Sequence, residues 1–165
     1  MKVDENNITK LLDGAKFAIQ PVKEEISSTG QPSHVDNSQP TEKTTSDGKV
    51  TFDKLVTGYY EIKETHTPEG YVIIGESQFY IHVNGGGITL VKVKAEVNGE
   101  ETVYTWEEGS SNSHVTLEAA TATVTNTPGV ELPSTGGPGT RLFIILGSIL
   151  ILGAGVLLWR RRRLI

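Results

Sequence analysis

The sequence predicts an all-β sandwich followed by a C-terminal transmembrane helix. Three observations support this fold class. Alternating apolar and polar residues recur along the first three quarters of the chain, turn residues separate these runs, and an uncharged apolar stretch lies near the end. The 165 residues suffice for one domain of ordinary size and an appendage. The absence of cysteine excludes a disulfide scaffold, thiolate metal sites and thiol catalysis.

The alternating runs give the predicted strands. In residues 91–97, valine and alanine alternate with lysine and glutamate, so one face is apolar and the other is charged. The pair Asn98-Gly99 follows and leads into residues 100–106, a pattern typical of a β-hairpin. Several short strands with turns between them indicate a sandwich or a barrel. The other predicted strands cover residues 16–19, 49–52, 59–64, 78–83 and 114–125.

Residues 20–48 lack this alternation. Proline, serine, threonine, glutamine and charged residues dominate there, without an apolar period. We therefore expect a long polar loop or insertion within a single domain that spans residues 1–128.

Charge is distributed unevenly along the chain. The formal net charge is −5, yet residues 1–135 hold ten lysines against twenty acidic residues. All five arginines lie between Arg141 and Arg163. The chain is therefore an acidic domain with a basic tail.

The apolar stretch from Leu142 to Trp159 predicts a transmembrane helix. Its 18 uncharged residues would span about 27 Å as a helix, close to the roughly 30 Å of a bilayer core. A buried core helix would need polar residues that this segment lacks. A basic cytoplasmic tail over residues 160–165 follows, and its position beside an apolar span favours membrane retention over nucleic-acid binding. The arginines of this tail are Arg160, Arg161, Arg162 and Arg163.

A linker over residues 129–141 precedes this span and contains the sequence LPSTG at 132–136. LPSTG, an apolar span and an arginine cluster, in that order, resemble the cell-wall sorting signal of Gram-positive surface proteins. The resemblance implies that a sortase cleaves between Thr135 and Gly136 and joins the Thr135 carbonyl to an amine of peptidoglycan or of another pilin subunit. The membrane would then hold only the precursor. The residues of the motif are Leu132, Pro133, Ser134, Thr135 and Gly136.

Four stretches of the domain resemble the Cna B-type domain, also called the prealbumin-like domain of Gram-positive pilins and adhesins. They are Lys2–Asp4, Leu12–Phe17, Gly58–Tyr71 and Ala122–Pro128. The resemblance implies an immunoglobulin-like β-sandwich that serves as a stalk module. It also implies an intramolecular isopeptide bond between Lys2 and Asn126, promoted by Glu64.

Strand periodicity supports the positions of Glu64 and Asn126 independently. Tyr60, Ile62 and Glu64 share one face of a strand, and so do Ala122, Val124 and Asn126. Burial favours the neutral amine of a lysine and the protonated acid of a glutamate. A protonated acid could hydrogen-bond the asparagine carbonyl and transfer protons while ammonia leaves. Since only Met1 precedes Lys2, the first strand is expected to be very short and prone to fraying.

These features predict a wall-anchored surface protein of a Gram-positive bacterium, part of a pilin subunit or adhesin stalk, and not an enzyme. Two alternatives stay open: a module that binds a host matrix protein, and a tail-anchored membrane protein that no sortase processes. The position of the protein as shaft, base or tip subunit also stays open. We expect no metal, because the four histidines lack ligand spacing. We also expect no cofactor and no nucleic-acid partner. An export signal is expected upstream, since the first residues show neither a basic nor an apolar signal region.

Overall fold

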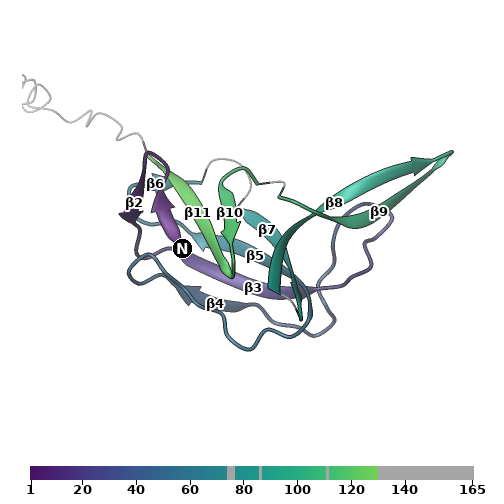
Figure 1. Cartoon of the computed structure of the whole chain (residues 1–165), viewed down its shortest axis with the longest axis horizontal. Helices are drawn as coiled ribbons and strands as arrows, with labels where there is room; N and C mark the ends of the chain where they lie inside the picture. The colour runs from purple at the N-terminus through teal and green to yellow at the C-terminus, as the bar shows by residue number, and fades with distance from the viewer. Residues whose placement is uncertain (74–76, 86, 111, 130–165) are drawn as a thin grey trace, which may run out of the picture. The chain divides into compact units, whose positions relative to one another are not determined.

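The computed structural model describes residues 1–73, 77–85, 87–110 and 112–129. In this part of the chain all regular structure is β, and two sheets face each other (Figure 1). The predicted all-β sandwich is therefore confirmed. The predicted transmembrane helix over 142–159 lies outside the described residues. Among the residues that are described, no helix is long and apolar enough to cross a membrane.

The first sheet brings the two ends of the domain together. Its spatial order is β10-β11-β1-β2, and β6 pairs with the end of β11. β1 runs parallel to β11, with Lys2 opposite Val124 and Asp4 opposite Asn126. The strands of this sheet are β1 (Lys2–Asp4), β2 (Asn7–Leu11), β6 (Tyr71–Val72), β10 (Val115–Glu118) and β11 (Thr121–Pro128).

The second sheet supplies most of the core. It is antiparallel throughout, in the order β4-β3-β5-β7-β8-β9. Alternate residues of its central strands point between the sheets and pack against Val115 and Val124 of the first sheet, because side chains alternate across a strand. The strands are β3 (Lys16–Val22), β4 (Thr41–Thr44), β5 (Gly58–His66), β7 (Gln78–Asn84), β8 (Gly87–Asn98) and β9 (Glu101–Glu108).

Two of the predicted strands differ from the structure. Residues 114–125 form two strands, because Ala119 adopts a left-handed φ of 50° at a turn between β10 and β11. Residues 49–52 form no strand, although Lys49 makes one isolated bridge with Ser46. The side chains of Val50 and Phe52 are partly buried against the core, although their backbone forms no strand.

The predicted loop over residues 20–48 is shorter in the structure. Its first three residues continue β3, and Thr41–Thr44 form the edge strand β4. The connecting residues 23–40 lie against the outer face of the second sheet. His34 Nε2 lies 2.9 Å from Glu61 Oε2, and the Trp106 indole N–H donates to the Glu24 carbonyl over 2.9 Å. These polar contacts hold residues 23–40 against the sheet.

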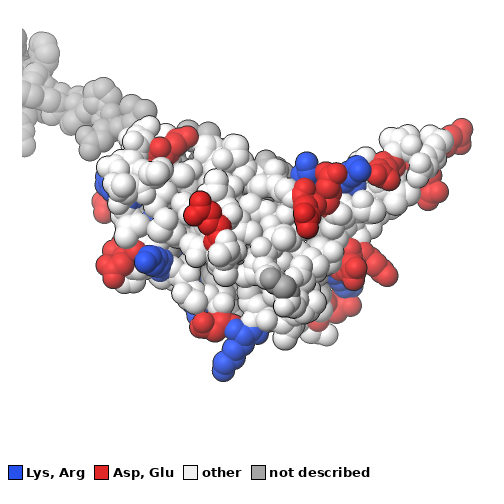
Figure 2. Space-filling model, viewed as in Figure 1, with Lys and Arg blue, Asp and Glu red and all other residues white. Residues whose placement is uncertain are grey.

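The β8–β9 hairpin extends from the second sheet as a long arm (Figure 1). Asn98 pairs with Glu101, so the predicted hairpin at Asn98-Gly99 is confirmed. Figure 2 shows acidic side chains at the tip of this arm. At its base, aromatic rings stack on the outer face of the sheet, with Tyr59 5.0 Å from Trp106 and 4.3 Å from His82 between ring centroids. Residues 23–40 therefore lie against an aromatic cluster.

We predict that Gly30→Ala loosens this contact. Gly30 has a φ of +74°, and an added Cβ would lie 2.6 Å from Tyr104 Cε1. Backbone strain and overpacking should lower the free energy of unfolding by about 1–3 kcal/mol. Trp106 is the only tryptophan in residues 1–131, so its fluorescence reports on this segment. Urea titration followed by that fluorescence should give an earlier transition. Gly85→Ala is the control, since its Cβ would meet nothing within 4 Å, and an equal loss in both variants would contradict the packing argument.

Candidate functional site

Lys2 lies near the start of the chain, yet its strand is held on both sides. Its backbone N–H donates to the Gly48 carbonyl over 2.6 Å, and its carbonyl accepts from Leu12 N over 3.0 Å. The neighbouring Val3 is fully buried. The Lys2 side chain is 0% exposed. A strand of three residues is therefore fixed by its neighbours, in contrast to the fraying expected from its position.

Asn126 and Glu64 come from opposite sheets. Asn126 follows Val124 on the inner face of β11 and is buried. Glu64 follows Tyr60 on the inner face of β5, where it lies opposite Phe17 of β3. The alternation predicted from the sequence therefore turns both side chains into the space between the sheets.

The Glu64 carboxylate contacts both of the other side chains. Its Oε2 lies 3.2 Å from Lys2 Nζ, and its Oε1 accepts a hydrogen bond from Asn126 Nδ2 over 2.8 Å. All three residues are buried, with exposed fractions of 0%, 4% and 2% for Lys2, Glu64 and Asn126. The structure thus places an amine, a carboxyl group and a primary amide around one point inside the sandwich.

Burial dominates the electrostatics of Lys2. It lowers the pKa of the amine below its ordinary value of 10.5, and the negative charge of Glu64 only partly opposes this. The distance to Glu64 fits an ion pair, but among the described residues Nζ has no partner with hydrogen-bond geometry. The Phe17 ring centroid lies 6.0 Å from Nζ. A low dielectric and an incompletely satisfied donor both favour the neutral, nucleophilic amine.

The orientation of the asparagine differs from the sequence-based expectation. The strand pattern suggested a protonated glutamate against the asparagine carbonyl. In the structure, the amide nitrogen faces Glu64 and acts as the donor. The carboxyl group is therefore closer to the nitrogen that would leave than to the oxygen that would become negative.

A second carboxylate lies beside this site and was not singled out from the sequence. Asp4 is buried, accepts a hydrogen bond from the Tyr71 hydroxyl over 2.8 Å, and lies 3.7 Å from Lys10 Nζ. The Tyr71 hydrogen bond is the main cause that lowers the pKa of Asp4. Lys10 lies on β2 with its side chain 55% exposed, so it belongs to the rim of the domain. The sequence held one indication of this position: Asp4 lies two residues after Lys2 on the same strand, so both side chains are expected on the same face.

The other predicted site residues lie outside the described part of the chain. They are Leu132, Pro133, Ser134, Thr135 and Gly136 of the sorting motif, and Arg160, Arg161, Arg162 and Arg163 of the tail. Within the described residues, no group of three or more histidine or acidic side chains could hold a metal ion.

The fold and the C-terminal sequence define a structural surface protein of a Gram-positive cell wall. The chain belongs to the SpaA family of prealbumin-like fold domains, whose model matches residues 1–97. The model of the LPXTG cell wall anchor motif matches residues 124–163. No curated protein matches the chain. Lys2 and Glu64 lie within the first matched segment, and Asn126 lies within the second. The candidate site therefore takes residues from both segments.

These matches assign the coarse function. The protein is located at the cell wall, and its anchor motif implies processing by a sortase and attachment to peptidoglycan. Its prealbumin-like domain indicates a structural, pilin-type component rather than an enzyme.

Proposed function

We propose that this protein is a wall-anchored stalk module, part of a pilin subunit or adhesin, whose domain is braced by an isopeptide bond between Lys2 and Asn126. One observation carries the proposal: the buried Glu64 carboxylate contacts both the amine and the amide. This arrangement supplies a nucleophile, a proton carrier and an electrophile without any cofactor.

The chemistry balances with these three side chains alone. Transfer of a proton from Lys2 to Glu64 gives a neutral amine and a neutral acid. The amine attacks Cγ of Asn126 and forms the Nζ–Cγ bond, while Glu64 donates its proton to Nδ2. The Cγ–Nδ2 bond breaks, Glu64 takes the remaining extra proton from Nζ, and one ammonia leaves. Because the product cannot turn over again, the reaction is a single self-modification.

The sorting motif supplies the second covalent link. We propose that a sortase cleaves between Thr135 and Gly136 and transfers the Thr135 carbonyl to an amine of peptidoglycan or of another pilin subunit. Pro133 fixes φ and favours an extended or kinked approach of the chain, and Gly136 leaves the scissile bond sterically open. The apolar segment that follows would hold this bond near a membrane enzyme and raise its effective concentration.

One experiment tests both links. The full chain in detergent is incubated with a sortase and an amine nucleophile, and the product is weighed by mass spectrometry. We expect residues 1–135 joined to the nucleophile by an amide bond, at about 17 Da below the mass calculated for that product, because the internal bond releases one ammonia.

Two variants make the sorting result specific. Thr135→Ala should abolish cleavage, whereas Thr140→Ala, just beyond the motif, should be cleaved like the unaltered chain. A chain that stays intact with the sortase would overturn the sorting proposal and favour a tail-anchored protein that keeps its apolar segment. A cleaved product without the mass deficit would overturn the internal bond alone.

A further inference from the structure

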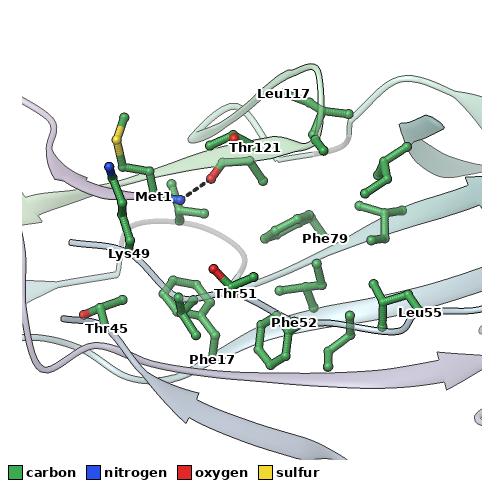
Figure 3. A pocket seen from close by; sticks show the side chains of 18 residues that line it. Met1, Phe17, Thr45, Lys49, Thr51, Phe52, Leu55, Phe79, Leu117 and Thr121 are labelled. Atoms are coloured by element: carbon green, nitrogen blue, oxygen red, sulfur yellow. Dashed lines mark hydrogen bonds between the residues drawn. The ribbon is translucent and has the colours of Figure 1, made fainter. Parts of the chain in front are cut away.

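An open apolar cavity of about 510 Å³ lies between the two sheets (Figure 3). Its walls include the core side chains Phe17, Ile19, Phe79 and Ile81 of the second sheet and Ala122 of the first. Protein interiors are normally packed as densely as organic crystals, with few voids larger than a water molecule. Apolar cavities that stay dry accept apolar guests. A void of this size in the centre of a sandwich therefore indicates a binding site.

The third wall of the cavity is the irregular segment 49–57. Phe52 and Leu55 of this segment pack against the core without forming a strand. A wall without ladder hydrogen bonds can separate from the sheets at a lower cost than a strand can. This segment therefore forms the wall that opens most readily for a flexible ligand.

The two ends of the cavity differ in charge. Lys49 lies at one end beside Met1, and Leu55 lies toward the opposite end (Figure 3). Lys49 is exposed, and the ion pairs formed among the described residues do not include it. The cavity thus combines an apolar interior with the exposed cation of Lys49 at its rim, while the Met1 ammonium beside it donates to the Ala122 carbonyl.

We propose that this cavity binds a single acyl chain with an anionic head group. The head group lies at Lys49, and the chain runs between the sheets toward Leu55. The volume falls within the roughly 300–1,000 Å³ range of small-molecule sites. The apolar walls favour a hydrocarbon chain, and the unpaired cation selects an anion over a neutral head group. A free fatty acid and a lysophospholipid share this chemistry.

The proposal is tested by calorimetric titration of residues 1–131, which contain the whole compact unit Met1–Gly129. Laurate is the anionic probe and dodecanol is the neutral probe of equal chain length. We expect laurate to bind about two- to fivefold more tightly than dodecanol, as one partly exposed charge pair implies. Lauroyl-lysophosphatidylglycerol distinguishes the two sources: tighter binding than laurate assigns a phospholipid, and weaker binding assigns a free fatty acid.

Three variants locate the ligand. Lys49→Glu should weaken laurate binding about tenfold and leave dodecanol unchanged. Lys63→Glu is the matched control, since Lys63 alternates with the inward-facing Ile62 and Glu64 and is exposed on the other side of the sheet. Ala122→Phe fills the cavity and should abolish binding of both probes, with the thermal transition confirming that the variant is folded.

The outcomes separate clearly. Absence of laurate binding, or laurate binding that survives Ala122→Phe in a folded protein, would overturn the cavity as the site. Equal affinity for the two probes, or equal effects of the two lysine variants, would overturn the role assigned to Lys49. None of these readouts depends on the internal bond, so the proposal stands or fails separately from it.

Discussion

Glu64→Ala is expected to leave residues 1–131 at their full calculated mass, whereas the unaltered polypeptide should weigh about 17 Da less. Without the carboxyl group, no side chain carries the proton from Lys2 Nζ to the leaving Asn126 nitrogen, since Glu64 is the residue that contacts both. Intact-mass spectrometry measures this directly. A mass deficit that persists in the variant would contradict the role of Glu64.

The same variant should lose much of its stability. A bond that closes the loop from Lys2 to Asn126 stabilises the fold by about 5 kcal/mol on a loop-entropy estimate borrowed from disulfides. Removing Glu64 also leaves a buried lysine without its counter-charge, which typically costs about 3–5 kcal/mol. The melting temperature should therefore fall by on the order of 20 °C or more.

Two further variants separate these contributions. Glu69→Ala removes an exposed carboxylate from the loop after β5 and should keep both the mass deficit and the melting temperature. The double variant Lys2→Met/Glu64→Leu replaces the buried pair by apolar side chains of similar volume, so no charge is left uncompensated. Its remaining loss of stability combines the loss of the bond with a buried Asn126 amide that no longer has Glu64 as acceptor. A double variant as stable as the unaltered domain would show that no covalent brace was present.

Alternation along single strands was sufficient to predict which residues point inward. Tyr60 and Glu64 on one strand, and Val124 and Asn126 on another, needed only the period of two. The parallel pairing of β1 with β11 was not predictable in this way. It depends on contacts between residues more than 120 positions apart, and a strand of three residues carries too little periodicity to reveal it.

One failed prediction has a physical cause. Residues 49–52 have the composition of a strand, yet they cover the cavity as irregular chain, so tertiary packing overrides local propensity there. The polar residues 23–40 lie between β3 and β4, and their contacts with Trp106 and Glu61 hold them against the sheet. Contacts with strands this far along the chain cannot be read from local composition.

The geometry of β1 and β11 determines how the domain bears force. Because these neighbouring strands are parallel, tension applied at the start of β1 and the end of β11 pulls them in opposite directions along their length. Such shear loads all the hydrogen bonds of the pair at once. The proposed bond from Lys2 to Asn126 would join the same two strands covalently, so tension would bypass the rest of the sandwich.

We therefore predict that the unaltered domain and the Glu64→Ala variant differ sharply in how far they extend under force. Each single domain is stretched between an N-terminal handle and a handle attached by a sortase at Thr135. Glu64→Ala should release the chain between Lys2 and Asn126 in one step of roughly 400 Å, at about 3.3–3.6 Å per residue. The unaltered domain should show no such step, since the covalent link excludes those residues from the force path, and Glu69→Ala should behave like it. Single-molecule force spectroscopy measures the step. A domain that carries the mass deficit but still extends by roughly 400 Å would place the cross-link between other residues, because only a bond joining the first and last strands shields the whole sequence between them.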